Sequence, residues 1–393
     1  MRRRRSHYSF LLAATGLIAG TTGCQSTYEG PTANPAFIQL SLGTSQVTGS
    51  QEAPLPFSSD VTEVTIIAET LDHNGDHWDY NGNLTVETRP AKLEGSPWAE
   101  IVDGRWEGTV SIRNGYGPTR IWLSDKGEMS PADYEPTWAT GVSDPLYFEF
   151  PTIGEMNRTD DPETNHLDGE FAELRIEDRS VIVTAVGTNG FWVSDTMDAQ
   201  GEHNSLFIYS FSAPGEEIEL GKRLTLLTGA NQEYLATTQL SFPTFDVADE
   251  PAITPPAASN IEDHCGDEML LEGYESAVVT VSGSSVPSGF GTDPNDEDYT
   301  DYLDYGQWPI TLSNGCTLYV DSSVPCPGFR PTDSLALSNV SGLLNQVWDK
   351  WIILIRDGDD LPAGMCASSQ TNTETPPAPS RPLPREAPSH WRL

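Results

Sequence analysis

The hydrophobic pattern of the chain is that of short β-strands separated by turns. In residues 59–155 apolar and polar side chains alternate over short runs, and Gly and Pro interrupt the intervals between them. This spacing predicts a β-sandwich. The runs that we expect to be strands are Val61–Ala68, Asn83–Thr88, Trp106–Ile112, Arg120–Leu123 and Leu146–Phe150.

The pattern continues in two further units. Residues 168–250 hold five β-rich runs with a longer excursion near residues 210–219, which favours a small closed barrel of the OB type. A Pro/Ala-rich linker, residues 251–264, leads to a second unit, residues 265–366. Residues 367–393 are rich in Pro and are expected to form a disordered tail.

Two resemblances refine this division. DHNGDHWDYNGNLTVET, GRWEGTVSIRNGYGPTRIWLSD and ATGVSDPLYFEFPTI, within residues 60–150, resemble bacterial Ig-like domains, which implies a spacer or adhesion-type module. VIVTAVGTNGFWVSD, SLFIYSF, IELGKRLTLLTG and YLATTQLSFPTFDV, within residues 170–250, resemble OB-like domains that accompany extracellular nucleases of the endonuclease/exonuclease/phosphatase group. The expected fold class is therefore all-β, an Ig-like β-sandwich followed by two small OB-like β-barrels.

The second barrel unit carries the same resemblance. LEGYESAVV, YGQW, CTLYV, NVSGLL and KWIILIR resemble segments of the second OB-like domain of those proteins. In that family the catalytic domain follows at this point, whereas here the Pro-rich residues follow. We therefore expect accessory modules without the nuclease, and no catalytic residue of that family has a position to which it can be assigned.

The first 24 residues predict export. Arg2–Arg5 form a basic region and Phe10–Gly20 an apolar run of signal-peptide length, too short to span a bilayer. Thr21-Thr22-Gly23-Cys24 resembles a bacterial lipobox, in which Cys24 becomes the lipidated first residue; the alternative is an ordinary secretory signal that contains a Cys. Residues 1–23 are thus the expected signal peptide and residues 24–58 a flexible tether. Gln25 is compatible with the outer membrane of a Gram-negative cell, on its periplasmic face or at the cell surface.

The net charge of −37 limits the partners. Such a surface repels nucleic-acid phosphates and lacks the basic stripe of a nucleic-acid binder. Besides the membrane contact through the lipid, a protein or glycan partner is expected, and an oligosaccharide suits an acidic barrel rim better than a polynucleotide does. The acidity also serves solubility, which is the simpler explanation.

Four cysteines besides Cys24 predict two disulfides. They are Cys265, Cys316, Cys326 and Cys366, and an even number in an exported chain indicates a disulfide framework with three connectivities. We favour Cys316–Cys326, which closes a short loop, with Cys265–Cys366. Zinc is the weaker alternative, because no CxxC pair occurs.

One acidic segment is a candidate metal site. Asp293, Asp296, Asp298 and Asp301 crowd into GTDPNDEDYTDYLDY, which we expect to be a loop of the second barrel. Clustered carboxylates repel one another unless a cation or solvent intervenes, so Ca²⁺ is the metal expected there, with a plain solvated loop as the favoured alternative. Asp72, Asn74 and Asp76 also alternate, but the segment departs from the EF-hand pattern and favours a turn.

Aromatic residues are the candidate binding groups. Trp192 and Tyr209 in the first barrel and Trp308 in the second could stack on a ligand, although small barrels also need aromatic cores. The motifs HExxH, GxSxG and the phosphate-binding loop do not occur, so we expect no enzyme. The sequence predicts a non-catalytic cell-envelope lipoprotein that binds or displays; the alternative is an accessory module that presents nucleic acid to a separate secreted nuclease.

Overall fold

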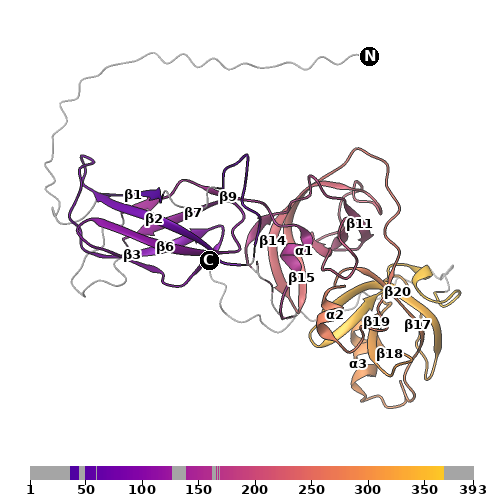
Figure 1. The fold of residues 1–393 in the computed structure, drawn as a ribbon. Coiled ribbons are helices and arrows are strands. Elements are labelled where there is room, and N and C mark those ends of the chain that lie inside the picture. Colours follow the sequence, from indigo (N-terminus) through magenta and orange to yellow (C-terminus); the bar gives the residue numbers. More distant parts are fainter. Residues whose placement is uncertain are drawn as a thin grey trace, which may run out of the picture.

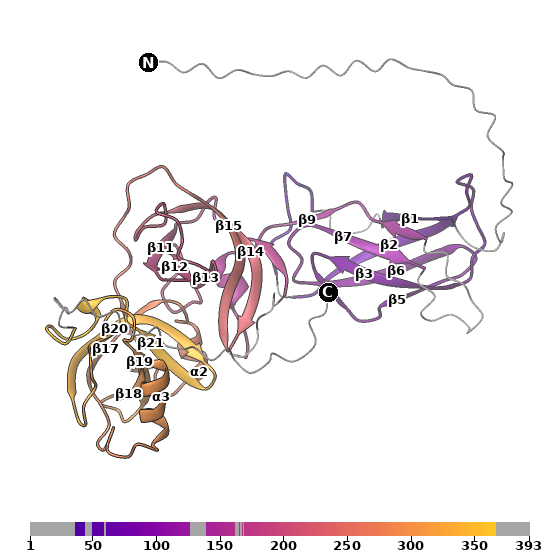
Figure 2. The same ribbon diagram turned by 180° about the vertical axis from the view of Figure 1, so that it is seen from behind.

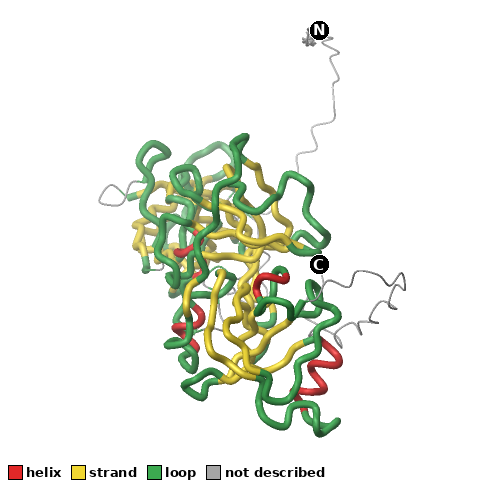
Figure 3. Tube along the Cα trace, turned by 90° about the vertical axis from the view of Figure 1, so that its right-hand side faces the viewer, coloured by secondary structure: helices red, strands yellow, loops and turns green. Residues whose placement is uncertain are grey.

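The all-β class is confirmed. The computed structural model describes residues 36–43, 49–58, 60–125, 139–161, 165, 167 and 169–366. A two-sheet sandwich is followed by two barrels, and the three units succeed one another along the chain (Figure 1, and from behind in Figure 2). Strands and their connecting loops make up most of the described chain, while the helices are short pieces beside the strands (Figure 3).

The sandwich buries one face of each of two sheets. One sheet has the order β1-β2-β6-β4; the other has the order β5-β3-β7-β8, with β9 beside β7. Alternation in β2 and β7 directs Ile66 and Ile121 into the shared core, where both are fully buried. The strands are β1 (Phe37–Leu42), β2 (Thr62–Leu71), β3 (Gly82–Arg89), β4 (Lys92–Glu94), β5 (Trp98–Ile101), β6 (Arg105–Arg113), β7 (Gly117–Ser124), β8 (Thr140–Val142) and β9 (Leu146–Phe148).

Part of the expected tether belongs to the sandwich. β1 pairs along its whole length with β2, and Ile38 is buried in the sandwich core. Leu55 forms a bridge with Phe148. The prediction of a flexible tether is therefore wrong for these described residues, because their apolar side chains complete the edge of a sheet.

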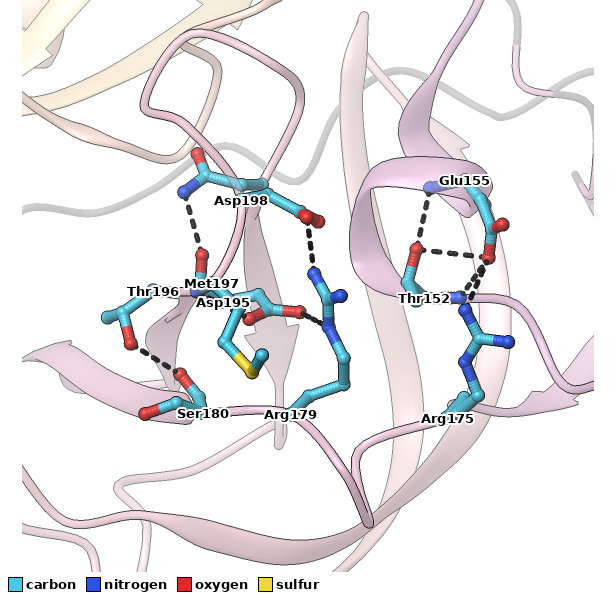
Figure 4. A network of polar contacts seen from close by, with 10 residues as sticks. Thr152, Glu155, Arg175, Arg179, Ser180, Asp195, Thr196, Met197 and Asp198 are labelled. Carbon is cyan, nitrogen blue, oxygen red and sulfur yellow. Dashed lines mark hydrogen bonds and ion pairs between the residues drawn. The ribbon is translucent and has the colours of Figure 1, made fainter.

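Polar contacts join the segment that follows the sandwich to the first barrel, and Figure 4 shows Arg175 beside Thr152 and Glu155. The short helix α1 (Ile153–Asn157) begins at Thr152, whose hydroxyl accepts the amide of Glu155 in a capping box. Arg175 forms ion pairs with Glu149, just after β9, and with Glu155. These contacts fix the direction in which the chain enters the barrel.

The first barrel has the strand order β10-β14-β15-β13-β12-β11, in which β13 and β15 are parallel. The amide of Val183 donates to the carbonyl of Lys222 over 2.8 Å, which closes β11 against the segment before β14. Phe191, Leu206 and Leu240 lie in its core. The strands are β10 (Phe171–Glu173), β11 (Val181–Val186), β12 (Gly190–Asp195), β13 (Ser205–Tyr209), β14 (Leu224–Tyr234) and β15 (Thr237–Val247).

The second barrel is a closed ring of strands in the order β17-β18-β19-β21-β20, with β20 pairing back onto β17 and β19 parallel to β21. β16, at the end of the expected linker, adds to β17 in parallel. The elements are β16 (Ser259–Asn260), α2 (Glu268–Glu272), β17 (Val278–Ser285), α3 (Glu297–Tyr305), β18 (Gln307–Thr311), β19 (Thr317–Asp321), β20 (Ala336–Val347), β21 (Lys350–Leu354) and the 3₁₀ turn η1 (Gly358–Asp360).

Both disulfides lie in this barrel, but the pairing favoured from the sequence is wrong. Cys265 bonds to Cys316, with Cα atoms 6.0 Å apart, and Cys326 bonds to Cys366, with Cα atoms 5.2 Å apart. The extended strand β19 begins directly after Cys316 and spans roughly 16 Å at ~3.3 Å per residue. The Cys326 amide donates to the Ser322 carbonyl over 3.0 Å, which holds Cys326 near the far end of this strand. A disulfide needs Cα atoms within about 7 Å, so these two cannot meet.

Candidate functional site

Five aromatic rings lie in successive contact on the first barrel. We call Trp192, Phe207, Tyr209, Phe211 and Phe242 the aromatic row. Their successive ring centroids are 4.5, 6.2, 4.5 and 4.8 Å apart, beginning with a stacked Trp192–Phe207 pair. These distances are those of interacting aromatic pairs, so the row is one continuous apolar surface.

Strand periodicity and register assemble the row. In β13 Phe207 and Tyr209 share one face, while the side chains of Leu206 and Ile208 enter the core. Phe207 lies directly opposite Trp192 of β12, and Tyr209 is in register with Ser241 of the parallel strand β15. The residues that follow these two positions, Ser210-Phe211 and Phe242, therefore lie side by side where β13 ends.

The outer end of the row is open to solvent. Phe211 is 53% exposed and Phe242 63% exposed. The two rings are in contact and form an apolar patch on the surface. Burial in the core would stabilise each ring by about 2 kcal/mol, and apolar patches that stay exposed often mark interaction sites.

The backbone at both exposed rings is strained. The φ angles of Phe211 and Phe242 are 64° and 52°, in the left-handed region that costs an L-residue about 1–2 kcal/mol. Phe242 and Pro243 lie opposite the single residue Gly229 where the β14–β15 register shifts, which is a bulge. A side chain at Gly229 would clash with Leu240 and with the Ser241 carbonyl. Bulges re-aim side chains, and strain of this kind gathers at functional surfaces.

The inner end of the row is covered by the second barrel. Trp192 and Phe207 are each 8% exposed and pack in one cluster with Val278 of β17 and Leu343 of β20. Tyr209 is half-buried at the rim of this cluster. The row therefore runs from the joint between the barrels out to solvent.

The residues next to Phe211 and Phe242 in the chain, Ser210, Ser212, Ser241 and Pro243, are uncharged. The Ser210 amide donates to the Asn189 carbonyl over 3.0 Å, and the Ser210 hydroxyl donates to the Ser212 carbonyl. Flat apolar rings flanked by hydroxyl and amide groups suit a neutral ligand that has both an apolar face and hydroxyl groups.

Two of the three aromatic residues predicted from the sequence lie in the row. Trp192 and Tyr209 do, but Trp308 is fully buried at the centre of the second barrel, where its indole donates to Ser322 over 3.2 Å. Trp308 is therefore a core residue, and its prediction as a binding residue is wrong for the folded chain. Phe211 follows the predicted Tyr209 by two residues. The sequence reasoning missed Phe207 and Phe242 as members of the row, and the local signal that could have found Phe207 is its alternation with Tyr209.

The predicted acidic loop is largely helix. Asp296 caps the N-terminus of α3 by accepting the Tyr299 amide over 3.1 Å, so the loop prediction is wrong for its second half. Asp298 accepts the Tyr319 hydroxyl, and Asp301 forms an ion pair with Lys350.

The carboxylates of this segment therefore serve separate protein partners. Asp293, before the helix, accepts the amide of Asn295 over 2.9 Å. Within the described ranges, no three or more His, Cys, Asp or Glu residues are grouped so that they could hold a metal ion. Calcium binding by these residues stays a prediction.

Cys24 and the predicted signal peptide lie outside the described residues, and so does the predicted Pro-rich tail. In the part of the chain that the structure describes, no helix has the length and apolar character needed to cross a bilayer. The two disulfides indicate an oxidising compartment outside the cytoplasm.

Comparison with known proteins gives no family. No family model matches the chain, and no curated protein matches it.

Proposed function

We propose that the protein is a non-catalytic binding module of the cell envelope, lipid-anchored through Cys24, which holds a neutral oligosaccharide against the aromatic row. The observation that carries this proposal is the exposed pair Phe211 and Phe242, two contacting rings on strained backbone where β13 ends. The disulfides support an extracytoplasmic location.

The strand orders support OB-like barrels. Each barrel has five main strands, β11–β15 in the first and β17–β21 in the second. Strands 1 to 3 are antiparallel neighbours, and strand 3 pairs in parallel with strand 5, which is β13 with β15 and β19 with β21. OB-folds bind oligonucleotides and oligosaccharides on the face of strands 2 and 3. In the first barrel these strands are β12 and β13, which carry Trp192 and Phe207 beneath the second barrel and Tyr209 at the rim next to the exposed rings.

The charge selects the class of ligand. A net charge of −37 opposes a polyanion, whereas a sugar ring has no charge to be repelled and can lay its apolar face on a phenyl ring. An oligosaccharide is therefore the occupant that fits both the rings and the electrostatics.

Binding of the chain to immobilised neutral oligosaccharides tests the proposal. The probes are β-linked chains of glucose and of N-acetylglucosamine, with sulfated chains and single-stranded DNA beside them. Stacking on a ring contributes about 1–2 kcal/mol, so the double variant Phe211→Ser, Phe242→Ser should bind at least tenfold more weakly. The matched control is Tyr234→Ser, because Tyr234 is 52% exposed on the same barrel.

Each outcome is informative. Binding of a neutral chain that the double variant loses and the control keeps supports the proposal. Salt-dependent binding of DNA with no binding of neutral chains would instead favour a module that presents nucleic acid to a nuclease. Equal losses in the control and the double variant would move the site away from the row.

A further inference from the structure

The interface between the two barrels, called the joint here, contains the apolar cluster that covers Trp192 and Phe207. It also contains a group of buried glutamates. Three glutamates from both barrels gather around Thr238 of β15. The Thr238 hydroxyl donates to Glu233 of β14 in the first barrel, and its amide donates to Glu275, which follows Glu272, the last residue of α2, by three residues in the second barrel. Glu272 is 3% exposed and Glu275 6% exposed. Burying two carboxyl groups beside a third acidic residue is costly when they are ionised.

Hydrogen bonds across the joint hold this cluster in place. Glu275 accepts the amide of Thr238 in β15 over 2.9 Å, and the Thr237 hydroxyl donates to the Gln346 carbonyl in β20. Two backbone bonds flank them, from His203 to Gly273 and from Trp348 to Leu235. The glutamates therefore lie within the contact that docks one barrel on the other.

The carboxyl groups of Glu272 and Glu275 are only partly satisfied. Glu272 Oε2 and Glu275 Oε1 are fully buried and have no partner with hydrogen-bond geometry, although the backbone amides of Thr238 and Gln346 act on Glu275 and partly offset its burial. Among the described residues neither group forms an ion pair, and the charges that act on them are those of Glu233 and Asp161 and of each other.

Among the described residues, no positively charged side chain lowers the pKa of Glu272 or Glu275. His203 lies in this contact through its backbone, but burial and, next, the positive charge of Arg158 lower the pKa of its imidazole, which favours the neutral ring. Burial and the neighbouring carboxylates raise the pKa of Glu272 to about 8 and that of Glu275 well above its usual range.

We propose that this acidic cluster is a proton-dependent latch: the barrels stay docked while Glu272 and Glu275 are protonated, and they separate when these groups ionise, which uncovers Trp192 and Phe207 of the aromatic row. The latch goes beyond the proposed function and does not depend on which ligand the row binds. It would let the pH outside the cytoplasm set how much of the row is open.

The direction of the pH effect follows from the raised pKa values. Docking is fully supported below the ordinary Glu pKa of 4.5, loses support as the pH rises, and has lost the Glu272 contribution above about 8. Each proton released on opening changes the ratio of open to docked molecules tenfold per pH unit in this window.

Small-angle scattering of the folded chain from pH 5 to 9.5 tests the latch, with binding of a hydrophobic dye as a second readout. The wild type should become longer and bind more dye above pH 8. The variant Glu272→Gln, Glu275→Gln carries neutral side chains of similar shape, so it should stay docked at every pH. The matched control, Glu216→Gln with Glu217→Gln, changes two exposed glutamates and should open as the wild type does.

Two results would overturn the latch: a wild type whose dimensions do not change up to pH 9.5, or a Gln variant that opens at the same pH as the wild type. If the Gln variant fails to fold, a ¹³C-carboxyl NMR titration of the wild type replaces it. Titration of both groups below pH 6 would then refute the latch, and titration of either near pH 8 or above together with opening would support it.

Discussion

The strained backbone of Phe242 predicts that Gly is more stabilising than Ala at this position, the reverse of the usual order in a strand. At a φ of 52° an added Cβ costs about 1–2 kcal/mol, and the following Pro243 restricts this residue further. Phe242→Ala and Phe242→Gly both remove the ring and its contact with Phe211, so they differ only in that Cβ. After subtracting the extra backbone entropy of Gly, about 0.5–1 kcal/mol, we expect the Gly variant to be more stable by ~0.5–1 kcal/mol.

A site in the same strand supplies the control. Thr244 is exposed and has ordinary extended backbone, so there Ala should be more stable than Gly by about 0.5–1 kcal/mol. Urea unfolding, monitored by hydrogen exchange in peptides that contain β12 and β13, measures the stability of the first barrel separately from that of the other units. If Ala is the more stable residue at both sites, Phe242 is not strained and the argument that strain presents this ring fails.

Two further predictions concern the disulfides and the anchor. Replacing Cys326 and Cys366 together by Ser should lower the free energy of unfolding of the second barrel by roughly 4 kcal/mol, since the bond closes a loop of 40 residues. Non-reducing peptide mapping of the wild type should find Cys265 linked to Cys316, and a Cys316–Cys326 peptide would contradict the fold. Cys24→Ser should move the protein from the membrane fraction to the soluble fraction; unchanged fractionation would exclude lipidation at Cys24.

The strands could be predicted because their signal is local. Trp106–Ile112 and Leu146–Phe150 show β-rich runs between turn residues, and both are strands close to the expected bounds, β6 and β9. Helix α3 was missed although Asp296 is a good N-cap and Tyr299 and Tyr302 recur three residues apart toward the core. The acidic composition of that segment masked a helical pattern that was present.

The candidate site could be predicted only in part, because it depends on pairing between distant strands. Tyr209 and Phe242 come together through the parallel pairing of β13 with β15, which no local pattern specifies. Glu275 accepts the amide of Thr238 from the first barrel, and no local pattern specifies this contact between residues 37 positions apart. The disulfide pairing failed for the same reason, since the extended β19 separates two cysteines that are near in sequence.

The most direct test of the central claim is an NMR titration of the folded chain, labelled with ¹³C at phenylalanine rings, with the neutral oligosaccharide that binds best. The account predicts shift changes at Phe211 and Phe242, with none at Phe37, which is 52% exposed on the sandwich. Shift changes that leave Phe211 and Phe242 untouched, or no change with any neutral chain, would contradict it.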